Sequence, residues 1–185
     1  MLPLKKALLL LLLLFPAALH AQAIGQVPWG ARVFSTGLPA SAAGYTSDEG
    51  PKMTKERRET ALECIEWTFG KIKEYEEYWG ECTDEHIFHV VFENGDWISF
   101  YNGRIGQYRI VSNRFAVGAD FLRGGGLRVG QKINLKKSRG DWVIRQSEKD
   151  PSRYYFTPVM CDDAAWAEVD ENGIIQCIQM WTKDC

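Results

Sequence analysis

The stretch VGQKINLKKSRG, from Val129 to Gly140, has the same outline as the stretch FGKIKEYEEYWG, from Phe69 to Gly80. Each begins with an apolar residue and a glycine, continues through nine residues of helix-forming character, and ends on a glycine. Glycine takes the positive φ at which helices often end, so each stretch is bounded like a short helix. Both stretches are followed by runs in which apolar and polar residues alternate, as they do in strands. The sequence therefore predicts a helix-plus-hairpins unit that occurs twice. The alternative is that two short Gly-bounded helices resemble each other by chance in a glycine-rich chain.

Residues 1–23 have the pattern of a cleaved export signal. Lys5 and Lys6 precede an apolar run over residues 7–15, which is too short to cross a bilayer as a helix. Pro16 interrupts the run, and Ala-Gln-Ala at 21–23 provides the small residues of a cleavage site. No cysteine lies near this site for lipid attachment. We expect cleavage after residue 21 or 23 and a mature protein that is periplasmic or secreted.

Charge and length exclude some classes of function. The formal net charge is −2, and removal of Lys5 and Lys6 with the signal changes it to −4. No basic stripe dominates, so nucleic acid is not an expected partner. No apolar run after the signal is long enough to span a membrane. The mature chain has 162 residues (185 minus 23), which suits one domain with a sizeable core.

Residues 24–52 are rich in Gly, Pro, Ala and Ser and show no hydrophobic periodicity. Such a composition buries too little apolar surface to offset the entropy of ordering, so we expect a flexible arm. Trp29, Val33 and Phe34 are the exception, because these side chains can dock on the domain or on a partner.

Residues 54–79 show one continuous apolar stripe. Its members are three or four residues apart: Leu62, Ile65, Phe69, Ile72, Tyr75 and Trp79. This periodicity predicts a helix. Gly70 lies within the stripe, and one glycine costs a helix only about 1 kcal/mol relative to alanine. We expect helix on both sides of Gly70, with a kink or a break there.

Residues 87–111 alternate like strands and contain the turn signals Asn94-Gly95 and Asn102-Gly103. Type I′ turns favour this dipeptide because both central residues need positive φ. If the turns are tight, Phe92 lies opposite Trp97 across the first one. The sequence therefore predicts a three-stranded meander.

This register divides the meander into two faces. On one face Trp97 also lies opposite Tyr108, in an aromatic cluster that we expect to be largely buried. The other face is apolar as well, at four positions: Val91, Ile98, Phe100 and Ile105. A surface sheet needs only one apolar face. These four residues are therefore our candidate binding face, unless the second half of the chain covers them.

Further strands are expected in the second half of the chain. A short strand lies within 112–128, and others cover 141–145, 153–160, 164–169 and 174–182. The last two form a hairpin in which Val169 lies opposite Ile174 and Trp166 opposite Cys177.

Together the patterns predict an α+β fold, in which one or more N-terminal helices pack on antiparallel β-meanders. Residues 53–185 form a single domain, or two tandem α/β units over 53–113 and 114–185.

Five cysteines lie in the part of the chain expected to be exported, where disulfides are permitted. An odd number leaves at least one free thiol. The register of the last hairpin places Cys161 near the end of the chain, so Cys161 with Cys185 is the preferred bridge. Cys64 and Cys82 can pair only if the helix between them breaks, because 18 residues of helix span about 27 Å.

The sequence contains no recognised catalytic or metal-binding motif. Cys82 precedes His86 and His89, and thiol–imidazole pairs form nucleophiles. The two histidines are three residues apart on a predicted strand, however, and so point to opposite faces. No CxxC, P-loop, dinucleotide fingerprint or serine nucleophile elbow occurs. We expect no catalytic residues, no metal site and no cofactor.

The stretches Gly70–Gly80 and Gly130–Gly140, with the strand sets that follow them, resemble the β-lactamase-inhibitor-protein type of fold. The small lipoprotein of the outer-membrane β-barrel assembly machinery shares that fold in single-unit form. The resemblance covers most of residues 69–182 as a pattern. The lipid-attachment cysteine is missing here, and no inhibitory-loop residue matches. The resemblance implies binding without chemistry, through a face of the sheet.

We therefore expect an exported, non-catalytic binding protein, either an inhibitor or an accessory factor of the cell envelope. Its partner would be an exported or envelope protein. Two alternatives remain: a carbohydrate- or peptidoglycan-binding module that uses an aromatic sheet face, and a hydrolase with an unrecognised site. An exposed flat patch favours the first function, a groove with polar groups the second, and a deep pocket with converging titratable residues the third.

Overall fold

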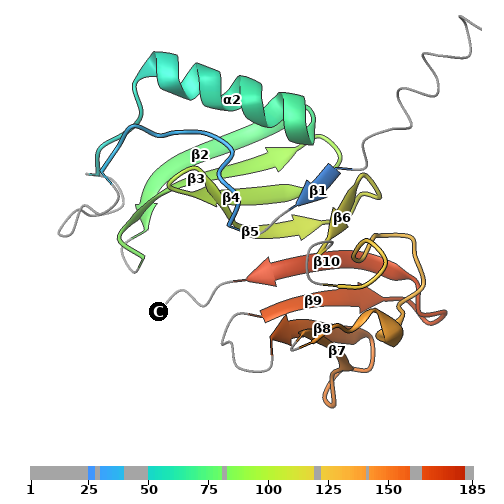
Figure 1. The fold of residues 1–185 in the computed structure, drawn as a ribbon. Helices are drawn as coiled ribbons and strands as arrows, with labels where there is room; N and C mark the ends of the chain where they lie inside the picture. Colours follow the sequence, from blue (N-terminus) through green and yellow to red (C-terminus); the bar gives the residue numbers. More distant parts are fainter. Residues whose placement is uncertain are drawn as a thin grey trace, which may run out of the picture.

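The computed structural model describes residues 25–27, 30–39, 50–80, 83–118, 122–140, 142–158 and 164–181. Within these residues, eight antiparallel strands form one sheet in the order β2-β3-β4-β5-β10-β9-β8-β7. The strands are β2 (Ile72–Gly80), β3 (Glu85–Phe92), β4 (Trp97–Tyr101), β5 (Arg104–Ile110), β7 (Trp142–Gln146), β8 (Arg153–Pro158), β9 (Ala164–Val169) and β10 (Ile175–Trp181). Two runs of hairpins, β2 to β5 and β7 to β10, thus meet where β5 pairs with β10 (Figure 1).

Helix α2 (Lys55–Phe69) lies across β2–β5 on one side of the sheet, which we call the helix face (Figure 1). Thr54 caps the helix, since its Oγ1 accepts a hydrogen bond from the Arg57 N–H at 3.4 Å. The buried helical positions recur every four residues: Ala61, Ile65 and Phe69. A helix packed on a large antiparallel sheet confirms the predicted α+β class for the described part of the chain.

The helix ends at Gly70, so the prediction that it continues to Trp79 is wrong. Gly70 has a φ of 107°, and its N–H donates to the Glu66 carbonyl at 3.0 Å in the last helical hydrogen bond. The following residues form β2, in which Tyr75, Glu77 and Trp79 lie on the helix face. The four-residue spacing from Tyr75 to Trp79 fits a helix and a strand alike. The charged Glu77 between them hides the alternation that would have indicated a strand.

The β3–β4 hairpin has a longer loop than the two-residue turn predicted at Asn94-Gly95. The Phe92 N–H donates to the Asp96 carbonyl at 2.9 Å, so three residues form the loop. Trp97 consequently lies opposite Val91 instead of Phe92. The predicted register is wrong by one residue, and Trp97 points to the opposite face from the one expected.

The Asp96 side chain accounts for the extra loop residue. Asp96 is fully buried, and its carboxylate accepts hydrogen bonds from the Val111 N–H at 2.7 Å and the Ser112 N–H at 2.9 Å. The Ser112 hydroxyl and the Asn94 amide donate to the other carboxylate oxygen, at 2.5 and 2.9 Å. A buried carboxylate needs such partners. Asp96 therefore fixes the loop against the end of β5.

The β4–β5 hairpin confirms the turn predicted at Asn102-Gly103. Both residues have positive φ, 48° and 76°, and Tyr101 lies opposite Arg104. Gly106, two residues after Arg104, is an extra residue that forms a bulge in β5. The pairing of β5 with β4 therefore shifts by one residue from Gln107 onward.

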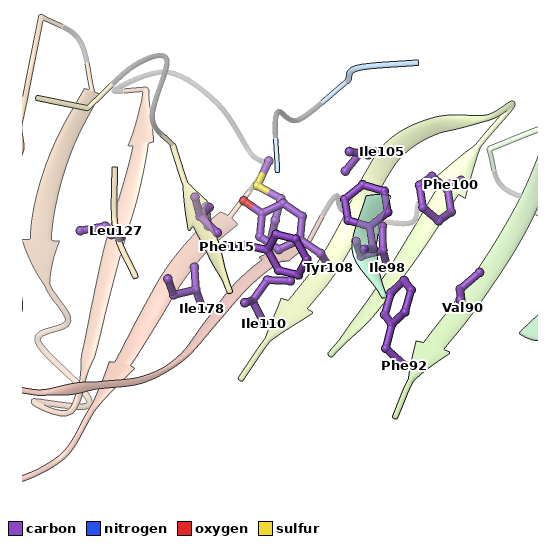
Figure 2. Close-up of a cluster of buried hydrophobic side chains, with 14 of the residues drawn as sticks. Val90, Phe92, Ile98, Phe100, Ile105, Tyr108, Ile110, Phe115, Leu127 and Ile178 are labelled. Carbon is purple, nitrogen blue, oxygen red and sulfur yellow. The ribbon is translucent and has the colours of Figure 1, made fainter. Parts of the chain in front are cut away.

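The core lies between the helix face and the elements that cover it. Beyond α2, buried side chains of β6 (Phe115–Val117) and of Leu122 and Leu127 belong to the same core. β6 pairs in parallel with β1 (Gly25–Val27). Figure 2 shows Phe115 beside Tyr108 and Ile110. The ring of Phe115 also lies 5.7 Å from that of Phe69, so one apolar core joins both halves of the sheet.

Residues 30–39, part of the predicted flexible arm, pack against the domain. The Val33 N–H donates to the Gly103 carbonyl at 2.8 Å. Phe34 is buried, with its ring 5.4 Å from the ring of Phe100. Val33 and Phe34 thus dock on the domain, as the sequence analysis allowed for them, and residues 30–39 are not a free arm. The predicted export signal, residues 1–23, and Trp29 lie outside the described residues.

The second Gly-bounded stretch, 129–140, is not an α-helix. It contains the short 3-10 turn Leu135–Lys137. The Ile133 N–H donates to the Gly173 carbonyl at 2.9 Å, so this backbone pairs with the β9–β10 hairpin instead of with itself. The first stretch is strand β2. Both predicted repeat helices are therefore wrong.

The β9–β10 hairpin forms where it was predicted, with a different register. Val169 lies opposite Ile175 instead of Ile174. A bulge between Ile175 and Cys177 shifts the register again, and Trp166 lies opposite Gln179.

Candidate binding face

The side of the sheet opposite α2 is called the open face. Residues directly opposite each other on antiparallel strands share a face, so the strand registers define its members. They include Glu74, Glu76, Tyr78, Ile87, His89, Val91, Trp97, Ser99, Tyr101, Arg104, Gln107, Arg109, Val143, Arg145, Arg153, Tyr155, Trp166, Glu168, Cys177, Gln179 and Trp181. In the described part of the chain, α2, Phe34, β6, Leu122 and Leu127 all pack on the other side, in the core.

His89 forms a small cluster in the first half of the open face. Its Nδ1 lies 2.8 Å from the Ser99 hydroxyl, and its ring lies 5.2 Å from the Trp97 ring. Burial lowers the pKa of His89, although the charges of Glu76 and Glu74 partly oppose this. The imidazole is therefore mainly neutral at pH 7, and its contacts hold the Trp97 ring in one position.

A second cluster lies on β8 and β9. The Arg153 guanidinium lies over the Trp166 ring, 5.3 Å from its centroid, and donates to Glu168 at 3.1 Å. The Trp166 Nε1–H donates to the same Glu168 oxygen at 3.2 Å. Hydrogen bonding to Tyr155 contributes most to a raised pKa of Arg153, which keeps its charge. The cation–π contact and the shared carboxylate together fix three large side chains.

Cys177 lies between the two clusters. Its thiol is buried, and burial raises its pKa despite the opposing charge of Arg109. Gln179 hydrogen-bonds to the thiol as well. Arg109 and Gln179 therefore continue the line of polar side chains from the first cluster to the second.

Tryptophan, tyrosine and arginine make the largest contributions to binding energy in protein interfaces. The open face presents all three, already oriented by neighbouring side chains, so little rotamer entropy remains to be lost on binding. Acidic residues on β2 lie at one end of the open face, Glu74 and Glu76, and basic residues on β7 and β8 lie at the other, Arg145 and Arg153.

The candidate binding face predicted from the sequence does not exist as one surface. Ile98 and Phe100 are 0% exposed and Ile105 is 1% exposed, in the core on the helix face. Val91 lies on the open face, partly exposed. The one-residue register error wrongly grouped Val91 with the other three residues, because it exchanges the two faces of β4 relative to β3.

Sequence reasoning missed Trp166, Arg153 and Tyr155 as members of the open face. A signal is present in β9, where Trp166 and Glu168 alternate with alanines, whereas the first four residues of β8 are all aromatic or charged. That alternation shows which residues share a face. It does not show which face remains open, since this depends on what covers the sheet.

The predicted disulfides fall largely outside the described residues, which exclude Cys82, Cys161 and Cys185. Cys64 is exposed on α2 and Cys177 is buried in the sheet, and both are free thiols. The structure therefore contains no Cys64–Cys82 bridge.

The described residues show no group of three His, Cys, Asp or Glu side chains placed to bind a metal ion. His86 and His89 point to opposite faces, as expected from their spacing. Ser99, the hydroxyl neighbour of His89, is only 4% exposed, so the pair offers a substrate little access.

Comparisons with protein-family models, with characterised proteins and with solved structures gave no significant match. A membrane-spanning helix is also not found in the described part of the chain. The functional argument therefore depends on the geometry of the open face.

Proposed function

We propose that the protein is an exported, non-catalytic binding protein whose open face binds another exported or envelope protein. One observation supports this most strongly: the uncovered face of the sheet contains aromatic and arginine side chains that are fixed by their neighbours. A surface sheet usually places solvated polar residues there. Trp97, Trp166 and Arg153 lie there instead, in contact with their neighbours.

The same geometry favours a protein over a carbohydrate as ligand. A sugar ring stacks on an aromatic ring whose face is free. The Trp166 ring is 9% exposed and is covered by the Arg153 guanidinium. The Trp97 ring is tilted by 48° against His89. The carbohydrate-binding alternative therefore has less support.

The architecture of the sheet fits the proposal. Two consecutive four-stranded meanders meet at β5 and β10, and this strand order is the support for a proposal of two tandem strand units, of which only the first carries an α-helix in the described residues. We infer this tandem arrangement from the strand order alone. Superposition of β2–β5 on β7–β10 tests it, and unlike strand curvatures in the two halves would contradict it.

Export is the remaining part of the proposal, and it rests on residues 1–23. The extracytoplasmic fraction should contain a protein whose N-terminus is Gln22 or Ile24, as measured by mass spectrometry. An intact Met1 in that fraction would contradict export by cleavage.

Affinity capture with the mature chain as bait tests the open face. The double variant Trp97→Ala with Tyr155→Ala removes two large side chains from this face. Trp67→Ala is the matched control, because Trp67 is 91% exposed on α2, away from the open face. Thermal melting checks that each variant is folded. We expect the double variant to lose the captured partner and the Trp67 variant to keep it.

If the double variant still captures the partner, the open-face proposal is overturned. Binding of soluble peptidoglycan fragments that depends on Trp97 would favour the carbohydrate alternative. Turnover of a generic ester, abolished by Ser99→Ala, would favour the hydrolase alternative.

A further inference from the structure

The outer edge of β2 and helix α2 border a groove at one end of the sheet. β2 is the last strand in the sheet order, so its outer edge has no partner strand among the described residues. The groove has a volume of about 520 Å³, and its lining residues come from these two elements: Leu62, Glu66, Ile72, Lys73, Glu74 and Tyr75. This site is separate from the open face, and the inference below does not depend on the proposed function.

The floor of the groove is apolar and rigid. Tyr75 is 42% exposed, and its ring lies 5.2 Å from the Phe88 ring in the core. Leu62 and Ile72 are partly buried and pack against the same core. The helix side is fixed by Glu66, which accepts a hydrogen bond from the Ile72 N–H at 3.0 Å. Alternate side chains of an extended segment could therefore rest on a preformed apolar surface.

Charged residues line the other side of the same edge. Glu74 and Glu76 are exposed and lie on the open face, opposite Val91 and His89. The Lys73 ammonium lies 4.0 Å from the Glu74 carboxylate in an exposed ion pair, with which a bound cation competes. Tyr75, between Glu74 and Glu76, points into the groove. An added strand would consequently contact carboxylates with one set of alternate side chains and the apolar groove with the other set.

These charges argue against a second copy of the chain as the added strand. Two β2 strands paired antiparallel about Tyr75 bring Glu74 opposite Glu76, and pairing about Glu76 brings Glu76 opposite itself. Like charges directly opposite each other destabilise a sheet. A cationic strand meets the same carboxylates favourably.

We propose that the edge of β2 binds an extended cationic segment in which Lys or Arg alternates with apolar residues. The segment adds to the sheet as a ninth strand, next to the eight described. Its backbone hydrogen-bonds to β2, its basic side chains contact Glu74 and Glu76, and its apolar side chains enter the groove beside Leu62 and Tyr75. This is the strand-addition mode of peptide recognition.

A synthetic peptide of alternating lysine and valine, labelled with fluorescein, is the probe. Fluorescence anisotropy with the full chain measures its affinity. We expect binding that weakens as salt rises, because exposed charges contribute. A glutamate–valine peptide should not bind. A lysine–valine peptide that is N-methylated at alternate residues should bind at least about tenfold more weakly, because it cannot complete the backbone pairing.

The variant Glu74→Lys with Glu76→Lys should weaken lysine–valine binding by about tenfold or more, since two exposed attractions become repulsions. The same variant should bind the glutamate–valine peptide. Glu148→Lys with Glu171→Lys is the matched control, because it makes the same charge change at exposed positions at the far end of the sheet. It should retain lysine–valine binding.

The proposal would be overturned if both double variants lost lysine–valine binding equally. It would also be overturned if the N-methylated peptide bound as tightly as the unmodified one. Either result would show that the peptide binds only by non-specific charge attraction. A lack of lysine–valine binding up to about 1 mM, the weak end of measurable affinity, would overturn the proposal as well. Sedimentation that shows a dimer of the wild-type chain, dissociated by the Glu74 and Glu76 changes, would assign the edge to a second copy instead.

Discussion

Glu77 and His86 share a hydrogen bond in the interior, with 3.0 Å between Glu77 Oε1 and His86 Nε2. Glu77 also accepts from the Met53 N–H at 2.6 Å and from Arg58 Nε at 2.8 Å. Burial alone would raise the pKa of Glu77, but these three hydrogen bonds outweigh it and lower the pKa below 4.5. One carboxylate thus joins β2, β3 and the start of α2.

The stability of the protein should fall as the solution is acidified. Burial lowers the pKa of His86 below 6.5, even though Glu77 opposes the shift. As the pH falls through 6.5, the unfolded state gains a proton on His86 that the native state does not, so unfolding becomes easier. Below 4.5 the same occurs at Glu77, whose native pKa is also lowered. Urea unfolding between about pH 8 and pH 4 measures the effect.

His86→Gln is the control for the upper part of this curve, because its amide can still donate to Glu77. The variant should show a smaller decrease between about pH 7 and pH 5 than the wild type. A wild-type stability that rises on acidification in this interval would contradict the assignment.

Glu77→Gln should destabilise the fold at neutral pH. The change keeps the shape of the side chain and removes the charge that Arg58 and the Met53 N–H bind. Hydrogen bonds to charged groups contribute about 1.5–3 kcal/mol each, so we expect a loss of about 2 kcal/mol in the free energy of unfolding. Glu59→Gln, at an exposed position of α2, is the matched control and should change it by less than about 0.5 kcal/mol. Equal effects of the two changes would mean that the buried network contributes nothing.

Phe100 and Trp97 should respond differently to truncation, because they lie on opposite faces of β4. Phe100 is fully buried, so Phe100→Ala should cost about 3–5 kcal/mol. Trp97 is partly exposed on the open face, and Trp97→Ala should cost less, about 1–2 kcal/mol. The predicted register, in which Trp97 is buried, assigns the larger loss to Trp97. Chemical denaturation of both variants distinguishes the two registers, and a larger loss for Trp97 would restore the predicted one.

The sequence predicted local features better than registers. Asn102-Gly103 was identified correctly because both φ angles of that turn are fixed by the dipeptide itself. Asn94-Gly95 gave the same signal, yet the buried carboxylate of Asp96 required a longer loop. A long-range contact of this kind cannot be read from turn residues, and a one-residue change exchanges the two faces of a strand.

The error at β2 has a similar cause. Glu77 lies at a buried strand position, where sequence patterns lead one to expect an apolar residue. Its partners, His86 and Arg58, come from β3 and α2, and so only the folded chain shows why a charge is tolerated there. The candidate site was missed for the same reason, since residues on β4 and β9 reach one face only through the β5–β10 pairing.

Cys64 and Cys177 should differ strongly in reactivity. Cys64 is exposed on α2, whereas the Cys177 thiol is buried and its pKa is raised by that burial. Only the thiolate reacts, so iodoacetamide at about pH 8 should label Cys64 first and Cys177 after unfolding. Peptide mass spectrometry distinguishes these two sites from the other cysteines. Rapid labelling of Cys177 in the native protein would show that the open face is more accessible around it than the structure indicates.

Gly106 should be required for the position of Tyr101 on the open face. Gly106 forms the bulge in β5, and a Cβ atom at this residue would lie 2.0 Å from Cδ2 of Tyr101. Because the neighbour is an aromatic ring in contact with the backbone, Gly106→Ala should displace that ring and cost about 1–3 kcal/mol by overpacking. In a Tyr101→Leu background the ring is absent, so the same glycine change should cost less. This non-additivity, measured by chemical denaturation of the two single variants and the double variant, isolates the contact. Additive losses would mean that Gly106 acts through its backbone conformation alone, and not through the ring of Tyr101.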